Sequence, residues 1–280
     1  MYQFLYEGGN AIPTSQPVEP EDVPQVVAIA RREMPPALLK NLKVDIGSAG
    51  YKKNDKKELI ASGDIDLMFE AGDAVALFQT ENNPKDPVLA AKKAMETYFV
   101  AKGIEADVNG KNVSVGIKYT TAKGGQGYAQ VDYMFIHDVD IVAPYHQHGP
   151  RGSYDDPAFK GKHNFIVMAS IAKALNMKFA PFDAHLVYRD TNQPVPDPVS
   201  GKPARTMDQV AHVLISPAAS AKDLYTVKSM VAALEEYDPV NANAKLKQAR
   251  DDQAKGLVTM PEAAPTPGTA AWFRKMGHNL

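Results

Sequence analysis

The chain has 280 residues, of which 44% are hydrophobic and 23% are charged, and its formal net charge is −2. This length and composition suit one large domain, or one domain with a helical appendage, and exclude global disorder. The small net charge excludes an overall basic field of the kind that drives non-specific nucleic-acid binding. The lack of cysteine excludes disulfides, thiol catalysis and cysteine-ligated metal centres.

The N-terminal stretch "MYQFLYEGGNAIP" has neither the basic segment nor the long apolar segment of a signal peptide. Nowhere do 18 apolar residues follow one another, so no membrane span is expected. The sequence therefore predicts a soluble, cytoplasmic protein.

The first elements in chain order are a helix and two strands. Residues 20–33 place apolar side chains at helical spacing, with acidic residues expected in the first turn, and Pro35 and Pro36 end the helix. "LKVDIGS" is typical of a short strand that runs into a turn, and "DIDLMFE" is typical of a second strand.

The next helix has the clearest boundaries in the chain. Asp86 is a typical N-cap, Pro87 suits the first helical position, and Gly103 suits the position just past the end. Its apolar side chains are expected to face the core: Leu89, Met95 and Phe99.

The remaining segments complete the prediction of an α+β protein. "NVSVGIKYTT" and "GYAQVDYMFIHDVDIV" are expected to be strands, and a helix is expected from about His163. A proline-rich extended loop at 191–204 precedes three predicted helices and a C-terminal Pro/Ala/Thr-rich tail. We therefore expect an N-terminal domain at 1–185 and a helical C-terminal region at 186–280.

The motif "DID" gives the first indication of function. Side chains alternate along a strand, so Asp64 and Asp66 point the same way while Ile65 and Leu67 point into the core. Two neighbouring carboxylates repel each other unless a cation lies between them. Mg²⁺ prefers oxygen ligands and is commonly held by one or two carboxylates together with substrate phosphates. The pair therefore predicts a Mg²⁺ or Mn²⁺ site.

A third carboxylate could complete this site. Asp132 lies between Val131 and Tyr133 on a second apolar strand, which could pair beside the strand that carries "DID". Three convergent aspartates suit a two-metal phosphoryl or nucleotidyl transfer. Gly47 and Ser48 follow the first strand and could offer backbone N–H groups and a hydroxyl to a phosphate.

This order of motifs resembles the DNA polymerase β-like nucleotidyltransferase superfamily. The shared pattern is a hydrophobic residue, Gly-Ser, a spacer, Asp-hydrophobic-Asp-hydrophobic and a later strand-borne aspartate. The form "SGDIDL" and the early "EGGN" are also similar to nucleotidyltransferases encoded by tailed bacteriophages.

The resemblance implies a mixed sheet flanked by helices and a catalytic role for the motif residues. It implies that Asp64, Asp66 and Asp132 bind the divalent metal and that Gly47 and Ser48 contact the phosphates of a nucleoside triphosphate. The implied reaction moves an NMP to a hydroxyl acceptor, which could be RNA or tRNA, a protein or a small molecule, and releases pyrophosphate. If a phage encodes the chain, the reaction takes place in the host cytoplasm.

Other charged residues have weaker patterns. Lys160 and Lys162, beside His163 at a predicted helix start, could bind the triphosphate or could be solvated. The same alternatives apply to the lysine-rich loop "YKKNDKKE". His146 and His148 lack a third soft ligand nearby, which favours a polar loop over a metal site.

Two comparisons bear on the choice of site and of function. Asp138 and Asp140 have the spacing of the "DID" pair but no Gly-Ser before them, which favours the earlier pair. The alternatives to a nucleotidyltransferase are a phage virion or interaction protein that keeps the fold without activity, and a metal-dependent nuclease. A nuclease would leave Gly47 and Ser48 without a role.

Overall fold

The computed structural model divides into two compact units, residues 1–148 and residues 149–280. The described residues are 11–46, 61–78, 86–146, 161–180, 185–256, 258 and 260, without the side chains at 44–46, 144–146 and 161–163. Within these ranges, no helix combines the length and apolar character needed to cross a membrane.

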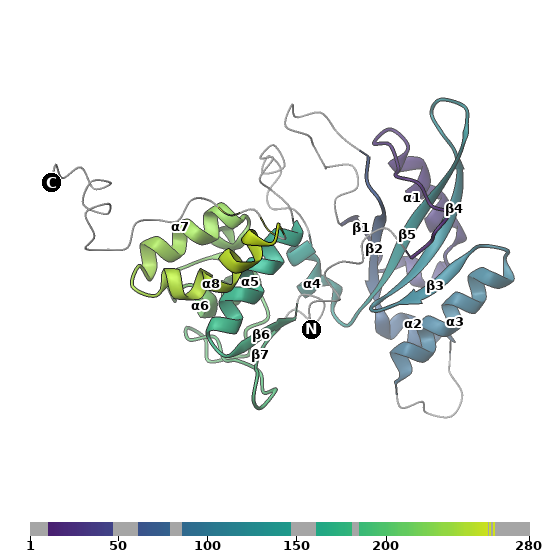
Figure 1. Ribbon diagram of the computed structural model, residues 1–280. Coiled ribbons are helices and arrows are strands. Elements are labelled where there is room, and N and C mark those ends of the chain that lie inside the picture. Colours follow the sequence, from purple (N-terminus) through teal and green to yellow (C-terminus); the bar gives the residue numbers. More distant parts are fainter. Residues whose placement is uncertain are drawn as a thin grey trace. The chain divides into compact units, whose positions relative to one another are not determined.

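The first unit combines helices with one sheet, as Figure 1 shows. Its helices are α1 (Val23–Glu33), the 3₁₀ helix η2 (Pro36–Leu39), α2 (Ala71–Phe78), α3 (Pro87–Ala101) and α4 (Val139–His146). Its strands are β1 (Lys43–Ile46), β2 (Ile65–Glu70), β3 (Ala106–Asn109), β4 (Asn112–Thr120) and β5 (Gln126–Ile136).

The sheet is mixed and has the strand order β1-β2-β5-β4-β3. β2 and β5 run parallel, and the other neighbouring pairs are antiparallel. The chain leaves β2 through α2, α3, β3 and β4 before it returns beside β2 as β5. The two strands predicted to carry the aspartates are therefore neighbours in space.

One face of the sheet forms the hydrophobic core of this unit. Alternate residues of β2, β4 and β5 are buried there against α1, α2 and α3, which lie along that face in Figure 1. From β2 the core takes Ile65, Leu67 and Phe69, and from β5 it takes Ala129, Val131, Tyr133 and Phe135. The residues between them, including Asp66 and Asp132, therefore belong to the opposite face.

The helices and strands predicted in this region are present, with three differences, and α2 and β3 were not predicted. Leu89 is 37% exposed, so the core face of α3 consists of Met95, Phe99 and their neighbours without it. The acidic residues expected inside the first turn of α1 precede Val23, and buried Asp22 accepts a hydrogen bond from the backbone N–H of Ala122 at 2.7 Å.

The third difference concerns "HDVDIV", which the sequence analysis assigned to a strand. β5 ends at Ile136, and α4 begins at Val139. The Asp138 carboxylate accepts a hydrogen bond from the backbone N–H of Ile141 at 3.0 Å, and Glu70 accepts one from Val139 at 2.8 Å. These two acceptors satisfy N–H groups that begin the helix, so the segment turns away from the sheet.

The second unit contains helices and a two-stranded sheet. Its elements are α5 (Gly161–Ala174), β6 (Met177–Ala180), β7 (His185–Tyr188), α6 (Met207–Leu214), the 3₁₀ helix η4 (Ala221–Leu224), α7 (Val227–Tyr237) and α8 (Ala242–Ala254). The helices of this unit were predicted from the sequence, and the β6–β7 pair was not. The domain boundary was predicted near residue 185, whereas the units divide before α5, because α5 packs against α8.

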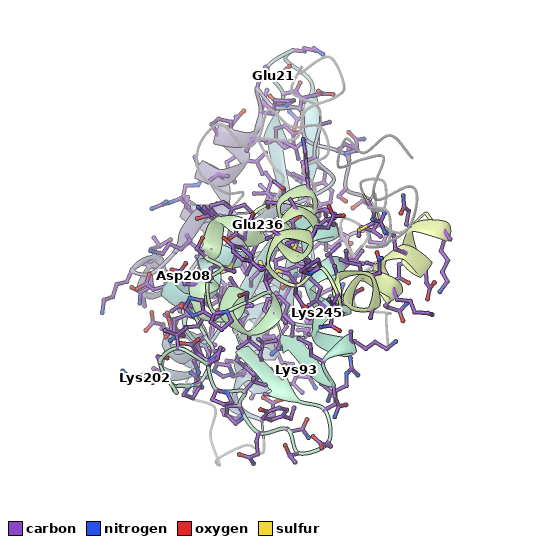
Figure 2. The ribbon with its side chains drawn as sticks, turned by 90° about the vertical axis from the view of Figure 1, so that its left-hand side faces the viewer. Glu21, Lys93, Lys202, Asp208, Glu236 and Lys245 are labelled. Carbon is purple, nitrogen blue, oxygen red and sulfur yellow. The ribbon has the colours of Figure 1, made fainter. Side chains whose placement is uncertain are left out.

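A buried lysine ties α8 to α6 in this unit. Lys245, labelled in Figure 2, donates a hydrogen bond to the carbonyl of Leu214 at 3.2 Å and forms an ion pair with Asp238 at 2.9 Å. Leu214 is the last residue of α6, so the ammonium group supplies a donor to a carbonyl that the end of the helix leaves without an intrahelical partner.

Asp197 organises the extended loop that leads to α6. Its carboxylate is almost fully buried and accepts hydrogen bonds from Ser200, from the backbone N–H of Val199 and from the ring of His212 at 2.8 Å. Although burial opposes its ionisation, these hydrogen bonds lower the pKa of Asp197 from 3.8 to about 2. The folded chain therefore retains this charge at a pH where the unfolded chain has lost it.

The Asp197→Asn variant is expected to be less stable at neutral pH by about 1.5–3 kcal/mol, because hydrogen bonds to a charged group are replaced by weaker ones. The folded pKa is depressed, so the stabilisation is present above pH 3.8 and disappears as the pH falls towards about 2. Urea unfolding followed by circular dichroism should show that the difference in free energy of unfolding between wild type and variant becomes smaller over this pH range. Asp190→Asn, at an exposed turn, is the control, and a gap that stays constant with pH would contradict this account.

Candidate metal centre

Three aspartates converge on the face of the sheet opposite the core. Asp66 on β2 lies in direct register with Asp132 on the parallel neighbour β5. Asp64 precedes β2 by one residue and shares the orientation of Asp66. One carboxylate oxygen from each of the three lies within 4.8 Å of the others. The pairing of the two strands that the sequence analysis suggested is thus confirmed.

The surroundings of Asp66 and Asp132 disfavour their ionised forms. Burial raises the pKa of Asp66 well above its usual value, and the charges of Asp64 and Asp132 raise it further. Burial also raises the pKa of Asp132, although the side chains of Ser114, Gln130 and Asn112 act against this effect. A cation between the carboxylates would offset both the burial and the mutual repulsion.

Two amide side chains hold Asp132 from opposite sides. Gln130 donates from Nε2 to Oδ1 of Asp132 at 2.9 Å, and Asn112 donates from Nδ2 to Oδ2 at 3.3 Å. Gln130 is 1% exposed, and its Oε1 accepts a hydrogen bond from the backbone N–H of Ile12 at 3.1 Å. The carboxylate is therefore fixed in orientation and connected to the segment before α1.

These supporting residues were not predicted from the sequence. Gln130 precedes Asp132 by two positions on one strand, so alternation alone could have placed it on the same face. Asn112 and Ser114 require the register of the β4–β5 hairpin, in which Ser114 lies opposite Asp132.

Asp138 and Asp140 have the same spacing as Asp64 and Asp66 but a structural role in α4. Asp138 accepts the hydrogen bond from Ile141 described above, and Asp140 forms an ion pair with Lys43 of β1 at 3.2 Å. Neither belongs to the cluster formed by Asp64, Asp66 and Asp132. The preference for the earlier pair as the candidate site is consistent with this difference.

Several predicted site residues fall outside the described part of the structure. They are Gly47, Ser48, Lys160, His148, the lysine-rich loop at 51–58 and the side chains of Lys162, His163 and His146. The phosphate contacts assigned to Gly47, Ser48, Lys160 and Lys162 therefore remain predictions.

The donor set has the chemistry of a hard divalent cation site. All three side chains offer carboxylate oxygens, which Mg²⁺ and Mn²⁺ favour over softer ligands. Asp64 and Asp66 are only partly buried, whereas Asp132 is buried. The residues present therefore fit a divalent metal ion.

Comparison with known proteins adds no relative to this picture. No model of a known protein family matches the chain, and no curated protein matches its sequence.

Proposed function

We propose that the chain is a metal-dependent nucleotidyltransferase with a polymerase β-like core in its N-terminal unit. One observation carries this proposal: Asp64, Asp66 and Asp132 converge on one face of a mixed sheet, with oxygens within 4.8 Å of one another. The order of motifs in the sequence supports it. The substrates are a nucleoside triphosphate and a hydroxyl acceptor.

Each aspartate has a distinct role in this proposal. Asp64 and Asp66 hold Mg²⁺ or Mn²⁺ together with the triphosphate, and Asp132 is a further ligand. Bound metal neutralises phosphate charge and lowers the pKa of the attacking hydroxyl. Gln130 and Asn112 keep the Asp132 carboxylate in one orientation, in which one of its oxygens lies within 4.8 Å of an oxygen of Asp64 and of Asp66.

The reaction is an in-line displacement at the α-phosphorus. The acceptor oxygen forms a bond to that phosphorus, and its proton passes to a carboxylate oxygen of Asp132. The bond between the α-phosphorus and the oxygen that bridges to the β-phosphorus breaks. Pyrophosphate leaves with the electron pair, and the acceptor retains the NMP as a phosphodiester.

A transfer assay tests the proposal. The full chain is mixed with each labelled triphosphate, Mn²⁺ and, in separate reactions, tRNA, protein or small hydroxyl compounds. We expect transfer by the wild type and a loss of at least about a thousandfold in Asp64→Ala and Asp66→Ala, because neutralisation of phosphate charge is a large term in such reactions.

Asp140→Ala is the matched control, since it removes a carboxylate from the second Asp-x-Asp pair on the same unit. No transfer by the wild type, or equal transfer by Asp66→Ala, would overturn the assignment. Calorimetric titration with Mn²⁺ and ATP then addresses the alternative: absence of binding would favour an interaction protein that keeps the fold without activity.

A further inference from the structure

A segment near the N-terminus, residues 12–18, is hydrogen-bonded to the chain just before Asp64. Val18 forms an isolated antiparallel bridge with Ser62. The backbone N–H of Val18 donates to the carbonyl of Ser62 at 2.8 Å, and the N–H of Ser62 donates to the carbonyl of Val18 at 3.0 Å. Ser62 precedes Asp64 by two positions, so this bridge fixes the chain at the entrance to β2.

Asp64 lies one residue before the first paired residue of β2. The pairing of β2 with β5 begins at Ile65, and its pairing with β1 reaches Asp66. The strand pairing therefore holds the backbone on the C-terminal side of Asp64, and the bridge at Ser62 holds it on the N-terminal side. The position of the Asp64 carboxylate consequently depends on segment 12–18 as well as on the sheet.

The same segment is hydrogen-bonded to β5 just before Asp132. The backbone N–H of Ile12 donates to Oε1 of Gln130 at 3.1 Å, and Nε2 of Gln130 donates to Oδ1 of Asp132 at 2.9 Å. The backbone N–H of Gln16 donates to the carbonyl of Tyr128 at 2.8 Å. Because a backbone N–H can only donate, the side-chain oxygen of Gln130 faces Ile12 and its nitrogen faces Asp132. The segment therefore determines which end of this amide meets the carboxylate.

Segment 12–18 is anchored at both of its ends. Ile12 is 1% exposed, and Val18 is fully buried in the hydrophobic core of the first unit. Between them, the backbone N–H of Ser15 donates to the carbonyl of Ile12 at 3.0 Å and closes a turn. Buried ends and a closed turn hold the two contact points of the segment at a fixed separation, which a loose chain would not do.

We propose that segment 12–18 is a positioning element of the candidate metal centre and sets the separation between Asp64 and Asp132. It acts on Asp64 through Ser62 and on Asp132 through Gln130. This inference rests on the proposed function, because it requires that the aspartates hold the metal ion. Groups that orient metal ligands change metal affinity by about 10–100-fold when they are replaced, so the effect is large enough to measure.

Hydrogen exchange in the wild type tests the coupling between the segment and the metal. Coupling is reciprocal, so a metal ion whose binding depends on the segment must also hold the segment in place. NMR-detected exchange at the amides of Ile12, Val18 and Ser62 should be at least about fivefold slower in saturating Mg²⁺ than in EDTA. The amide of Ile104, which donates to Phe99 at the end of α3, is the control in the same unit and should slow by less. Equal slowing at all four amides would report only a rise in global stability and would overturn the proposal, as would no slowing.

Substitution of Gln130 tests the connection to Asp132. Gln130→Met removes both amide hydrogen bonds and keeps a similar side-chain volume, so it should raise the Kd for Mn²⁺ by about tenfold or more. Gln126→Met, at an exposed position of the same strand, is the matched control and should leave the Kd unchanged. Phe99→Leu lowers stability from the core side of the sheet and should change the Kd by less than about twofold. An unchanged Kd in Gln130→Met, or an equal rise in Phe99→Leu, would contradict a positioning role.

Two substitutions of Ser62 test the connection to Asp64. Ser62→Ala and Ser62→Pro both remove the hydroxyl, but only proline also removes the N–H that donates to Val18. The Kd for Mn²⁺ should therefore be about fivefold higher in Ser62→Pro than in Ser62→Ala. Equal Kd values in the two variants would overturn the role assigned to this bridge. Circular dichroism checks that each variant folds, and the hydrogen-exchange experiment decides the question in the wild type if one does not.

Failure of this proposal is distinguishable from failure of the proposed function. If the wild type binds Mn²⁺ but neither hydrogen exchange nor the Kd responds as described, segment 12–18 has no positioning role and the metal centre stands. If metal and segment are coupled but no NMP is transferred in the assay described above, the positioning role stands and the nucleotidyltransferase assignment is wrong. If the wild type binds neither Mn²⁺ nor Mg²⁺, both are wrong.

Discussion

Replacement of Asp66 by asparagine is expected to weaken the proposed binding of a divalent metal and, at the same time, to stabilise the metal-free protein. Asn has the shape of Asp without its charge. The substitution therefore removes the repulsion between residue 66 and the charges of Asp64 and Asp132, and it removes the free-energy cost of burying the ionised Asp66 carboxylate. In EDTA at neutral pH we expect a higher Tm in the variant, with a rise of about 2–4 °C for each kcal/mol gained.

The stability of the metal-free protein is also expected to depend on pH. The pKa of Asp66 is raised in the folded chain, so in wild type the stability of the metal-free protein falls as the pH rises from the ordinary aspartate value through the raised one. This fall should be smaller in Asp66→Asn. With Mn²⁺ present, the wild type is expected to have the higher Tm, because the metal stabilises only the protein that binds it.

Thermal unfolding with and without Mn²⁺, together with calorimetric titration, measures both effects. The Kd for Mn²⁺ should rise by at least about a hundredfold in Asp66→Asn. Asp107→Asn, at an exposed position of β3 in the same sheet, is the control and should change neither quantity. Equal Mn²⁺ affinity in wild type and Asp66→Asn would mean that the three aspartates do not form the metal site.

Replacement of Phe99 by alanine is expected to cause the largest loss of stability, about 3–5 kcal/mol. Phe99 is fully buried, and its ring stacks on that of Tyr133 with centroids 5.3 Å apart. Tyr133 in turn donates a hydrogen bond to the carbonyl of Ala30 in α1 at 2.8 Å. The cavity left by the ring would lie where α1, α3 and β5 meet, directly behind the strand that carries Asp132.

Leu89 provides the matched comparison on the same helix. It is 37% exposed, so Leu89→Ala should change the stability by less than about 1 kcal/mol. Phe99→Leu should recover part of the loss because it refills much of the volume. Urea unfolding midpoints measure all three, and similar losses in Phe99→Ala and Leu89→Ala would contradict the burial of α3 described here.

The features that the sequence predicted well are encoded in a few neighbouring residues. The helix at 87–101 has its N-cap at Asp86, where the carboxylate accepts a hydrogen bond from the backbone N–H of Leu89 at 2.9 Å. The alternation in "DIDLMFE" placed Ile65 and Leu67 in the core and the aspartates on the other face. These signals act within one element and need no knowledge of its partners.

The features that were missed depend on contacts between distant segments. That β2 and β5 could lie side by side was suggested, but neither their parallel direction nor the register that joins Asp66 to Asp132 was predicted, because the chain passes through α2, α3, β3 and β4 between them. The hydrogen bond from Ile12 to Gln130 spans 118 positions. "HDVDIV" was assigned to a strand because its apolar residues alternate. In the structure, the first N–H groups of α4 donate hydrogen bonds to the carboxylates of Glu70 and Asp138, and the segment begins a helix instead.

The alternation along β5 also limits how this chain can change in length. Each residue from Gln126 to Ile136 belongs either to the core or to the face of the aspartates, so the insertion of one residue between Tyr128 and Asp132 would turn Gln130 or its neighbours towards the wrong side. Such an insertion would damage the hydrophobic core and the candidate metal centre in the same molecule. The hairpin turn at 121–125 is under no such constraint, so length variation in evolution or engineering is expected there rather than in the strand.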